Sequence, residues 1–439
     1  MNFQDTLAFA NSEDRKDPLK SFRRSFHIPK QPNGKKHLYF CGNSLGLQPK
    51  TTKSFLQQEL NDWKAYGVEG HFHSKNPWLP YHEFLTKNMA NVVGAKPIET
   101  VVMNTLSVNL HLMMVSFYRP TKKKFKILIE HDAFPSDRYA VASQVAFHGY
   151  DPKKSIISLK ARKGETLLRM EDIEKTIKTQ GDEIALILFG NPNYYTGQFL
   201  DMKTITKMGR KKKCMVGFDC AHGAGNLPLN LHDTGADFAV WCTYKYLNSG
   251  PGSLGGCFVH ERHAKAKKIP RFTGWWGHNK STRFGMRDGF DPIPGVEGWQ
   301  LSNPPILSMA AIYASLEIFE SAGMERLRTK SIRMTGYLEF LLNRMKTNRV
   351  RIITPTDPSQ RGCQLSVQVL DADKKLYDKL TKKGVIADWR EPDVIRVAPV
   401  PLYNNFKDCW QLVDNLKSCL LYTSPSPRDA TLSRMPSSA

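Results

Sequence analysis

Residues 238–256 have the sequence FAVWCTYKYLNSGPGSLGG, an apolar run that reaches a lysine and continues into a glycine-rich loop. Lys245 stands between Tyr244 and Tyr246, a setting that fits a solvated surface lysine poorly. A lysine amine among aromatic and apolar neighbours can form a Schiff base with an aldehyde. We therefore take the end of this run as the candidate centre of an active site.

Three further apolar runs precede this one, and each is followed by turn or helix-start residues. The four runs are Phe125–Ile129, Ile184–Phe189, Met215–Phe218 and Phe238–Cys242. Runs of strand length that alternate with helix-like segments predict an α/β fold with a mainly parallel sheet covered on both faces. Ligand sites in such folds form at the carboxyl ends of the strands, so the residues just after each run are the candidates for a site.

The third run ends in a carboxylate, within the segment CMVGFDCAHGAGN of residues 214–226. Asp219 closes the run, and His222 lies three residues further on. A carboxylate at this place stays ionised when a cation lies beside it, and the pyridinium nitrogen of a cofactor is such a cation. A strand-end aspartate is also a common helix cap, so Asp219 alone leaves both interpretations open. Together with Lys245 it favours a cofactor site.

Hydroxyl and amide side chains gather at the start of a predicted helix. Apolar residues at positions 106, 110, 113, 114 and 117 share one helical face, and Arg119-Pro120 ends the pattern. Asn104, Thr105 and Ser107 crowd its first turn. A helix N-terminus offers free N–H groups and the positive end of the helix dipole, which suits a phosphate group. Plain N-capping explains the same residues and is the favoured interpretation of this segment alone.

The run Phe125–Ile129 leads into a loop with an aromatic residue. Phe134 follows the strand end, and Pro135, Ser136 and Asp137 then start the next predicted helix. Phe134 could stack on a planar ring, although a phenylalanine after a strand is more often part of the core. Asp137 either caps the helix or orients the polar groups of a site.

The charge balance of the chain is strongly basic. Its 439 residues include 63 Lys and Arg against 41 Asp and Glu, a formal net charge of +22. Short basic runs occur at residues 122–124, 211–213 and 265–268, without the interleaved aromatic residues of a face that binds single-stranded nucleic acid. A solvated basic surface is therefore the favoured interpretation, and a nucleic-acid-binding protein is the alternative from another class.

No apolar stretch approaches the ~20 residues of a membrane span. The N-terminus lacks the basic-then-apolar pattern of a signal peptide. Eight cysteines are scattered along the chain, with no CxxC pair and no Cys/His cluster at zinc spacing. We expect a cytoplasmic protein with reduced thiols, no metal site and no membrane partner.

A second domain is predicted beyond the break at Asn303-Pro304-Pro305. Residues 306–322 have a helical pattern, and short strands are expected near Gln364–Val369 and Val394–Val397. The expected organisation is an N-terminal arm with a helix from about Thr51 (residues 1–60), a large domain (61–305) and a smaller C-terminal α/β domain (306–418).

Residues 419–439 form a tail unlike the rest of the chain. The segment CLLYTSPSPRD departs abruptly from the helical pattern of DCWQLVDNLKS and has no core-forming pattern. Its codons, and those of residues 433–439, can be spelled as two fragments of a transposase-type sequencing adapter in the right order and frame. We interpret this tail as a translated adapter and leave it out of the fold.

Eight motifs along the chain carry a resemblance to a known family. They are FCGNSLGLQPK from Phe40, FPSDRYA from Phe134, YYTGQ from Tyr194, GFDCAHGAGN from Gly217, YKYLNSGPG from Tyr244, STRF from Ser281, SNPPIL from Ser302 and RVAPVPLYN from Arg396. In this order, over roughly residues 40–415, the sequence resembles the kynureninase family.

This resemblance implies a pyridoxal-phosphate-dependent enzyme of fold type I, with a mainly parallel, seven-stranded sheet in its large domain and a smaller C-terminal α/β domain. It implies a homodimer that hydrolyses the Cβ–Cγ bond of kynurenine or 3-hydroxykynurenine, giving alanine and an anthranilate. The sequence does not indicate which of the two substrates is preferred.

The resemblance also assigns roles to residues at the cofactor. Lys245 would hold the cofactor aldehyde and carry the Cα proton, and Tyr244 would reach the phosphate and assist proton transfer at the substrate carbonyl. Asp219 would pair with the pyridinium nitrogen, with His222 beside it. The remaining cofactor-binding residues that the resemblance implies are Leu106, Ser107, Phe134, Pro135, Ser136, Asp137, Gly190, Trp275 and Asn303.

The substrate would be bound by four residues. His71 and Asn303 would bracket its aromatic end, and Arg396 would clamp the α-carboxylate bidentately, a geometry that suits arginine. Trp275 and Asn303 would also bind the cofactor phosphate across the dimer. The family pattern has a threonine where this chain has Ser107, and a small hydroxyl residue where it has Gly190. Asn191 or Asn193 are the candidates to supply the hydrogen bond that a hydroxyl group at position 190 would make.

A cysteine desulfurase or lyase of the same fold is the nearest alternative function, because Cys363 lies in the segment RGCQ. A mobile nucleophile requires an exposed, glycine-rich loop and a lowered thiol pKa. Cys363 instead leads into the alternating pattern of QLSVQVL, so the start of a strand is the favoured interpretation.

Overall fold

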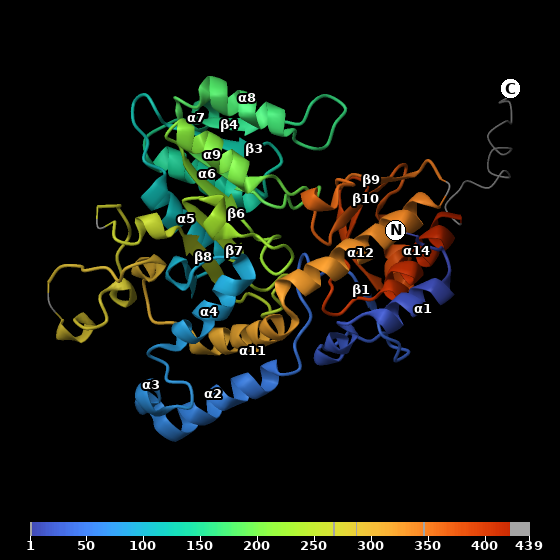
Figure 1. Ribbon diagram of the computed structural model, residues 1–439, viewed down its shortest axis with the longest axis horizontal. Helices are drawn as coiled ribbons and strands as arrows, with labels where there is room; N and C mark the ends of the chain where they lie inside the picture. The colour runs from blue at the N-terminus through green and yellow to red at the C-terminus, as the bar shows by residue number, and fades with distance from the viewer. Residues whose placement is uncertain (1, 267, 287, 346, 422–439) are drawn as a thin grey trace, which may run out of the picture.

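The computed structural model describes residues 2–266, 268–286, 288–345 and 347–421 (Figure 1). Its main sheet has seven strands in the order β2-β8-β7-β6-β5-β3-β4. The strands are β2 (Thr100–Met103), β3 (Lys126–Glu130), β4 (Ile156–Leu159), β5 (Ile184–Gly190), β6 (Met215–Asp219), β7 (Phe238–Cys242) and β8 (Gly255–Val259). β8 runs antiparallel to both of its neighbours, and the other pairs are parallel. The expected mainly parallel seven-stranded sheet is confirmed.

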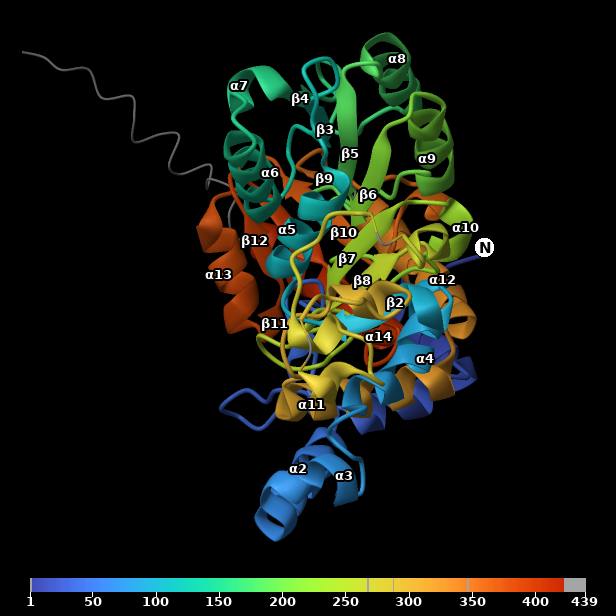
Figure 2. The same cartoon turned by 90° about the vertical axis from the view of Figure 1, so that its left-hand side faces the viewer.

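Alternate residues of these strands face opposite cores, because side chains along a strand point to opposite sides. In β5, Leu186 and Leu188 belong to one hydrophobic cluster, and Ile187 and Phe189 belong to the other. Figure 2 shows α5, α6 and α7 on one side of the sheet and α8, α9 and α10 on the other. These helices are α5 (Leu106–Phe117), α6 (Pro135–Phe147), α7 (Pro152–Ser155), α8 (Met170–Gln180), α9 (Met202–Lys211) and α10 (Leu231–Thr234).

The C-terminal part of the chain forms a second α/β unit. Its antiparallel sheet has the order β12-β13-β10-β9, and helices pack on it around a separate hydrophobic cluster. The elements are β9 (Val350–Ile352), β10 (Leu365–Val369), β12 (Asp388–Arg390), β13 (Val394–Val397), α12 (Met324–Asn343), α13 (Lys374–Lys382) and α14 (Phe406–Leu421). β10 and β13 lie where the sequence predicted strands.

The N-terminal segment packs on this second unit. The expected extended arm contains a helix, α1 (Leu7–Lys16), whose neighbour is α14. Phe3 and Phe9 pack against the C-terminal cluster, and β1 (Leu38–Tyr39) pairs with β11 (Val385–Ile386). The small number of apolar residues in this segment favours an extended arm, and tertiary packing stabilises the helix instead.

The long helices α11 (Ile306–Ala322) and α12 connect the two units, and a short arm formed by α2 (Thr52–Tyr66) and α3 (Gly70–His73) projects beside them (Figure 1). α11 has the bounds predicted from the sequence and packs on α4 (Tyr81–Val93) and α2. α2 and α3 extend away from the body in both views (Figures 1 and 2). Trp63, Val68 and Phe72 are more than half exposed there.

The short 3₁₀ segments are η1 (Lys20–Ser25), η2 (Gly67–Glu69), η3 (Pro97–Glu99), η4 (Glu261–His263), η5 (Trp275–Gly277), η6 (Arg283–Gly285), η7 (Val296–Trp299) and η8 (Pro358–Gln360). Among the described residues, no single helix is long and apolar enough to cross a membrane. Within the same described residues, α11 and α12 together, a pair bent by 77°, reach that length and composition.

The predicted adapter tail lies mostly outside the described residues, which end at Leu421. Its first three residues, 419–421, still belong to α14, and Cys419 is buried in the C-terminal cluster. The helical pattern therefore continues slightly beyond the boundary that the change in composition indicated.

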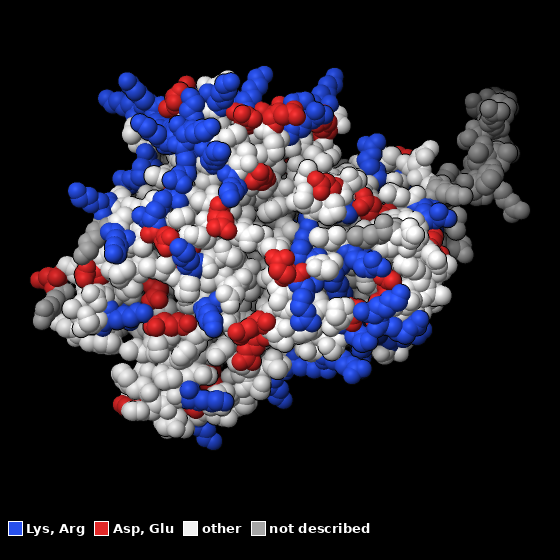
Figure 3. All heavy atoms as spheres, in the orientation of Figure 1, with Lys and Arg blue, Asp and Glu red and all other residues white. Residues whose placement is uncertain are grey.

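The basic residues are spread over the surface. On the face drawn in Figure 3, Lys and Arg side chains gather at the upper edge and at the lower right, with Asp and Glu side chains among them.

Candidate functional site

A cavity of about 160 Å³ lies at the carboxyl edge of the main sheet, where β3, β5 and β6 end and β7 leads into its loop. It is lined by Leu106, Ser107, Glu130, Phe134, Ser136, Asp137, Gly190, Pro192, Tyr194, Asp219, Ala221, His222, Tyr244 and Lys245. All of the expected cofactor-binding residues line it except Pro135, Trp275 and Asn303. We call this space the inner cavity.

Lys245 and His222 meet inside the inner cavity. The Nζ atom of Lys245 lies 3.1 Å from Nε2 of His222, whose ring is buried. Burial, and then the charge of Lys245, hold the pKa of His222 well below its usual range. The ring is therefore neutral and accepts a hydrogen bond from the lysine amine through Nε2. Its other nitrogen, Nδ1, is buried and has no hydrogen-bond partner among the described residues.

Two carboxyl groups share the floor of the cavity. Asp219 ends β6, and its Oδ1 accepts a hydrogen bond from the backbone N–H of Ala221 at 2.7 Å. Burial raises the pKa of Asp219. Burial, then the charge of Asp219 and a hydrogen bond shared with it, raise the pKa of Asp137 well above its usual range. Oδ1 of Asp137 is buried and has no hydrogen-bond partner in the described ranges of the chain.

This pair fits a cationic N–H donor on a planar ring. One ionised carboxylate of the two would be stabilised by a protonated ring nitrogen, and the unpartnered oxygen would gain a donor. The expected pyridinium nitrogen of pyridoxal phosphate meets both requirements. A bound cofactor explains why two carboxyl groups lie together here, whereas simple helix capping does not.

Two helix N-termini converge on the other end of the cavity. α5 begins at Leu106 after the extended residue Thr105, and α6 begins at Pro135. Ser107 and Ser136, one from each helix, lie side by side with their hydroxyl oxygens 2.8 Å apart. Free N–H groups, two hydroxyl groups and two positive dipole ends suit a phosphate group. Pro135 does not line the cavity and serves as the first residue of α6.

Phe134 presents its ring to the inner cavity. The residue is 41% exposed in the loop between β3 and α6, and its ring centroid is 5.9 Å from Nζ of Lys245. Tyr194 packs edge-on against it, with ring centroids 5.2 Å apart. A ring held on its edge and open on its face is available to stack on a planar cofactor.

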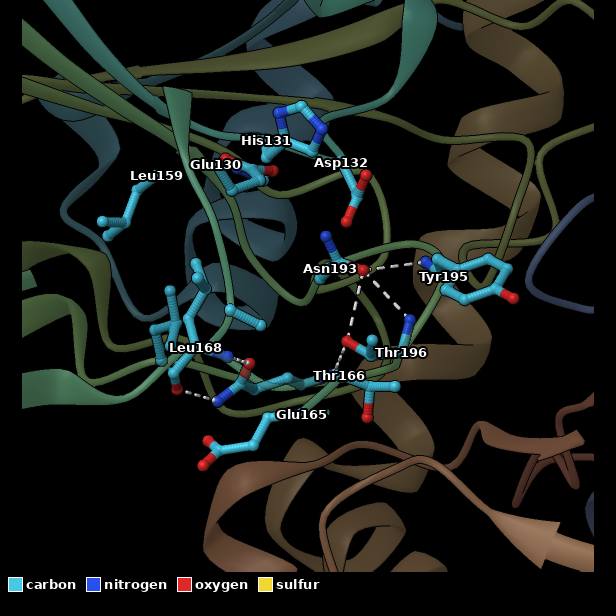
Figure 4. Close-up of a pocket in the computed structure, with 14 residues that line it drawn as sticks. Glu130, His131, Asp132, Leu159, Glu165, Thr166, Leu168, Asn193, Tyr195 and Thr196 are labelled. Atoms are coloured by element: carbon cyan, nitrogen blue, oxygen red, sulfur yellow. Dashed lines mark hydrogen bonds between the residues drawn. The ribbon is translucent and has the colours of Figure 1, made fainter. Parts of the chain in front are cut away.

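The space beside Gly190 is filled by a residue that the sequence interpretation missed. Oε1 of Glu130 accepts a hydrogen bond from the backbone N–H of Gly190 at 3.0 Å. Asn191 and Asn193 do not take the place of a hydroxyl group at position 190. The side-chain amide of Asn191 forms hydrogen bonds with the backbone of Leu200. Oδ1 of Asn193 accepts hydrogen bonds from the backbone N–H groups of Tyr195 and Thr196 (Figure 4).

Comparisons with known proteins decide the family. The kynureninase of Myxococcus xanthus is 59% identical over 415 residues, covering 94% of this chain and 97% of that protein. The kynureninase of Nematostella vectensis is 47% identical, with 95% of each chain covered. The chain belongs to the kynureninase family. The model of the kynureninase C-terminal domain also matches, over residues 327–416.

Two distant proteins of known structure have the same fold as this kynureninase family member. A C-DES variant with glycine covalently linked to the PLP cofactor superposes with a TM-score of 0.75 at 16% identity, covering 90% of this chain and 98% of that one. The cysteine desulfurase from Thermococcus onnurineus superposes with a TM-score of 0.72 at 17% identity, covering 91% and 99%. At this identity the similarity shows the fold alone.

Arg396, the expected carboxylate clamp, lies just behind the inner cavity of this kynureninase family member. It is buried on β13, and its Nη2 lies 2.6 Å from Oδ2 of Asp388. Nη1 donates to the backbone oxygen of Tyr194, a residue of the cavity wall, at 2.6 Å. In the structure the carboxylate partner of Arg396 is therefore Asp388, and the substrate contact stays a prediction.

Three further expected site residues lie outside the inner cavity. His71 belongs to α3, where Nδ1 is 2.9 Å from the backbone oxygen of Val68. Trp275 lines a different cavity of about 430 Å³, and its indole N–H donates to the backbone oxygen of Arg283. Asn303 is exposed in the segment before α11. Within a single chain of this kynureninase family member, these three residues lie away from Lys245.

Cys363, the basis of the desulfurase alternative, is fully buried just before β10. Its backbone N–H bonds the side chain of Asn226, and burial raises the pKa of its thiol to about 12. A protonated, enclosed thiol is a poor nucleophile. The start of a strand was the correct interpretation of this residue.

Proposed function

We propose that this chain is a pyridoxal-phosphate-dependent hydrolase that cleaves the Cβ–Cγ bond of kynurenine, 3-hydroxykynurenine or both, releasing alanine and the matching anthranilate. The observation that carries the proposal is the contact of Lys245 with a neutral, buried His222 above the carboxyl pair of Asp219 and Asp137. The names of its relatives, which are 59% and 47% identical, support the same reaction.

Each part of the cofactor has residues that suit it. Lys245 would hold the aldehyde carbon, and Asp219 with Asp137 would hold the ring nitrogen. Phe134 would stack on the ring, and the N-termini of α5 and α6 would bind the phosphate through Ser107 and Ser136. Pyridoxal phosphate supplies an electron sink for the electron pair left when a bond to the substrate α-carbon breaks.

The protein groups then move the protons. The amine of Lys245 takes the proton from Cα of the substrate, and Nε2 of His222 accepts a hydrogen bond from that amine and fixes its direction. Burial raises the pKa of Tyr244, so its hydroxyl stays protonated and can donate to the γ-carbonyl oxygen as water adds to that carbon. Arg396 would bind the α-carboxylate from behind Tyr194.

We also propose a homodimer in which His71, Trp275 and Asn303 serve the site of the partner subunit. Support comes from their position away from the inner cavity of their own chain, and from the exposed apolar side chains of the projecting arm. These side chains are Leu60, Trp63, Tyr66, Val68 and Phe72. Contiguous exposed apolar surface is typical of protein interfaces. A cytoplasmic location is proposed from the scattered cysteines, among which no CxxC pair occurs.

Incubation of the purified protein with kynurenine and pyridoxal phosphate tests the activity. We expect fluorescent anthranilate and alanine in equal amounts, and no sulfide from cysteine. Consumption of cysteine without any turnover of kynurenine or 3-hydroxykynurenine would overturn the proposal in favour of the desulfurase.

A further inference from the structure

Glu130 and Gly190 form a wall between two neighbouring cavities. Both line the inner cavity, and both line a second cavity of about 150 Å³ on the other side, which we call the outer cavity. Figure 4 shows the outer cavity, with Glu130, His131 and Asp132 at one end and Glu165 at the other. Glu130 is therefore part of the cofactor site without being among the residues assigned to it.

Strand order brings Glu130 close to Asp219. β3, β5 and β6 are neighbours in the sheet, and their last residues are Glu130, Gly190 and Asp219. Gly190 and Asp219 are also register partners. Because Gly190 has no side chain, Glu130 reaches across the end of β5. A Cβ atom at position 190 would lie 2.8 Å from its Oε1, which is too close. Glu130 thus fills the side-chain space of position 190.

A short chain of hydrogen bonds connects Glu130 to Asp219. Oε1 of Glu130 accepts from the N–H of Gly190 at 3.0 Å, and the next N–H, that of Asn191, donates to the backbone oxygen of Asp219 at 2.7 Å. Without the acceptor, the partly buried N–H of Gly190 would lose its hydrogen bond and the end of β5 would shift. Such a shift would move Asp219 with it.

The surroundings of Glu130 favour its neutral form. The residue is 5% exposed, and Oε2 has no hydrogen-bond partner within the part of the chain that the structure describes. The titratable groups that act on it are Asp132, Asp137 and Asp219, all acidic, while Lys245 is the cation of the same cavity. Burial raises the pKa of Glu130 to about 8. An ionised carboxylate with an unpartnered buried oxygen would be costly.

We propose that Glu130 is a positioning residue of the cofactor site, a neutral carboxylic acid that holds the backbone at Gly190 and thereby fixes the place of Asp219. The part of this inference that concerns the cofactor rests on the proposed function, because Asp219 is argued there to pair with the ring nitrogen. The contact between Glu130 and Gly190 itself is independent of the cofactor.

The first test uses the apoprotein and needs no activity. Melting temperatures are measured for the wild type, Glu130→Ala, Gly190→Ser and the double variant. We expect Gly190→Ser alone to lower the melting temperature by about 2–4 °C. The serine should cost much less when Glu130 is alanine, because its Cβ then has space. Strictly additive effects would overturn the inference.

The second test measures the affinity of each variant for pyridoxal phosphate through the visible absorption band. Glu130→Gln keeps the acceptor and a donor, so its affinity should stay within about twofold of the wild type, whereas Glu130→Ala should bind about tenfold more weakly. Glu165→Gln, at the far end of the outer cavity, is the matched control and should change nothing. If Glu130→Gln were as impaired as Glu130→Ala, or Glu130→Ala were unimpaired, the inference would be overturned. A wild type that bound no pyridoxal phosphate would refute the proposed function and leave the first test standing.

The third readout is the pH dependence of apoprotein stability. The folded state keeps the proton of Glu130 between its ordinary pKa of 4.5 and about 8, while the unfolded state releases it. The stability contributed by this group therefore disappears as the pH rises through that window. Asp137 and Asp219 change in the same direction, so the difference between the wild type and Glu130→Gln isolates Glu130. An identical slope in both proteins would overturn the neutral-acid assignment.

Discussion

The amine nitrogen of Lys245 lies 3.1 Å from Nε2 of His222, so among the described residues the one nitrogen of the buried ring with a partner is the one that faces the proposed catalytic lysine. Burial keeps that ring neutral, and a neutral ring can accept a hydrogen bond from an ammonium group but cannot compete with it for a positive charge. The hydrogen bond thus orients the lysine amine, and the neutral ring leaves that amine able to act as a base.

Two replacements of His222 test its role as a hydrogen-bond acceptor separately from its change of protonation state. His222→Gln retains an acceptor for Lys245 and should keep kcat within about tenfold, whereas His222→Phe should reduce kcat about 100-fold or more. Equal reductions in the two variants would show that the hydrogen bond to Lys245 is unimportant.

Acid stability gives a second prediction for the same residue. Since the pKa of His222 is lowered in the folded state, the unfolded state binds more protons below the ordinary value of 6.5. The stability of the apoprotein should therefore fall as the pH drops below 6.5, by up to about 1.4 kcal/mol per pH unit from this group. His222→Gln should lack that part of the slope in a series of chemical denaturation curves, and a slope unchanged from the wild type would contradict the assignment.

Arg396 is predicted to bind the substrate carboxylate although it is paired with Asp388. Arg396→Lys should raise KM for kynurenine at least about tenfold with a smaller effect on kcat, because lysine lacks the bidentate geometry. The matched control is Asp388→Asn, which removes the internal partner but leaves the guanidinium. If Arg396 were purely structural, the two variants would show the same drop in melting temperature and the same KM.

Cys363→Ala is predicted to keep most of the activity on kynurenine. The thiol is buried, its pKa is raised to about 12, and it lies just before β10 rather than in a mobile loop. The expected cost is one of stability, about 1–2 kcal/mol for the poorer packing. A variant that folds, as judged by its melting curve, but turns over no kynurenine would contradict this prediction.

Sharing of residues between subunits can be tested by mixing two inactive variants. Lys245→Ala and Trp275→Ala, unfolded together and refolded, should form hybrid dimers in which one site has both wild-type residues. Half of the dimers would be hybrids with one good site in two, so about a quarter of the wild-type activity should return. Recovery of no activity from a mixture shown to contain hybrids would place Trp275 outside the partner's site.

The sequence predicted well the features that depend on local pattern. The bounds of β7, α11 and β13 follow from apolar runs and helical periodicity, and the place of Asp219 follows from the rule that sites lie at strand ends. The same rule applied to the run Phe125–Ile129 would have indicated Glu130, which ends β3.

Features that depend on strand order or register could not be obtained in this way. Glu130 meets Gly190 only because β5 lies between β3 and β6, whereas β4, which follows β3 in the chain, lies at the edge of the sheet. Arg396 meets Asp388 because the two are register partners in β12 and β13. The helix α1 forms because it packs on α14, a contact between the two ends of the chain that no local pattern encodes.

The most direct test of the account is to identify the lysine that holds the cofactor. The protein loaded with pyridoxal phosphate is treated with borohydride, digested and analysed by mass spectrometry. We predict a visible absorption band that disappears on reduction, and a pyridoxyl group on the peptide that contains Lys245. A stable label on any other lysine, with Lys245 unmodified, would contradict the account.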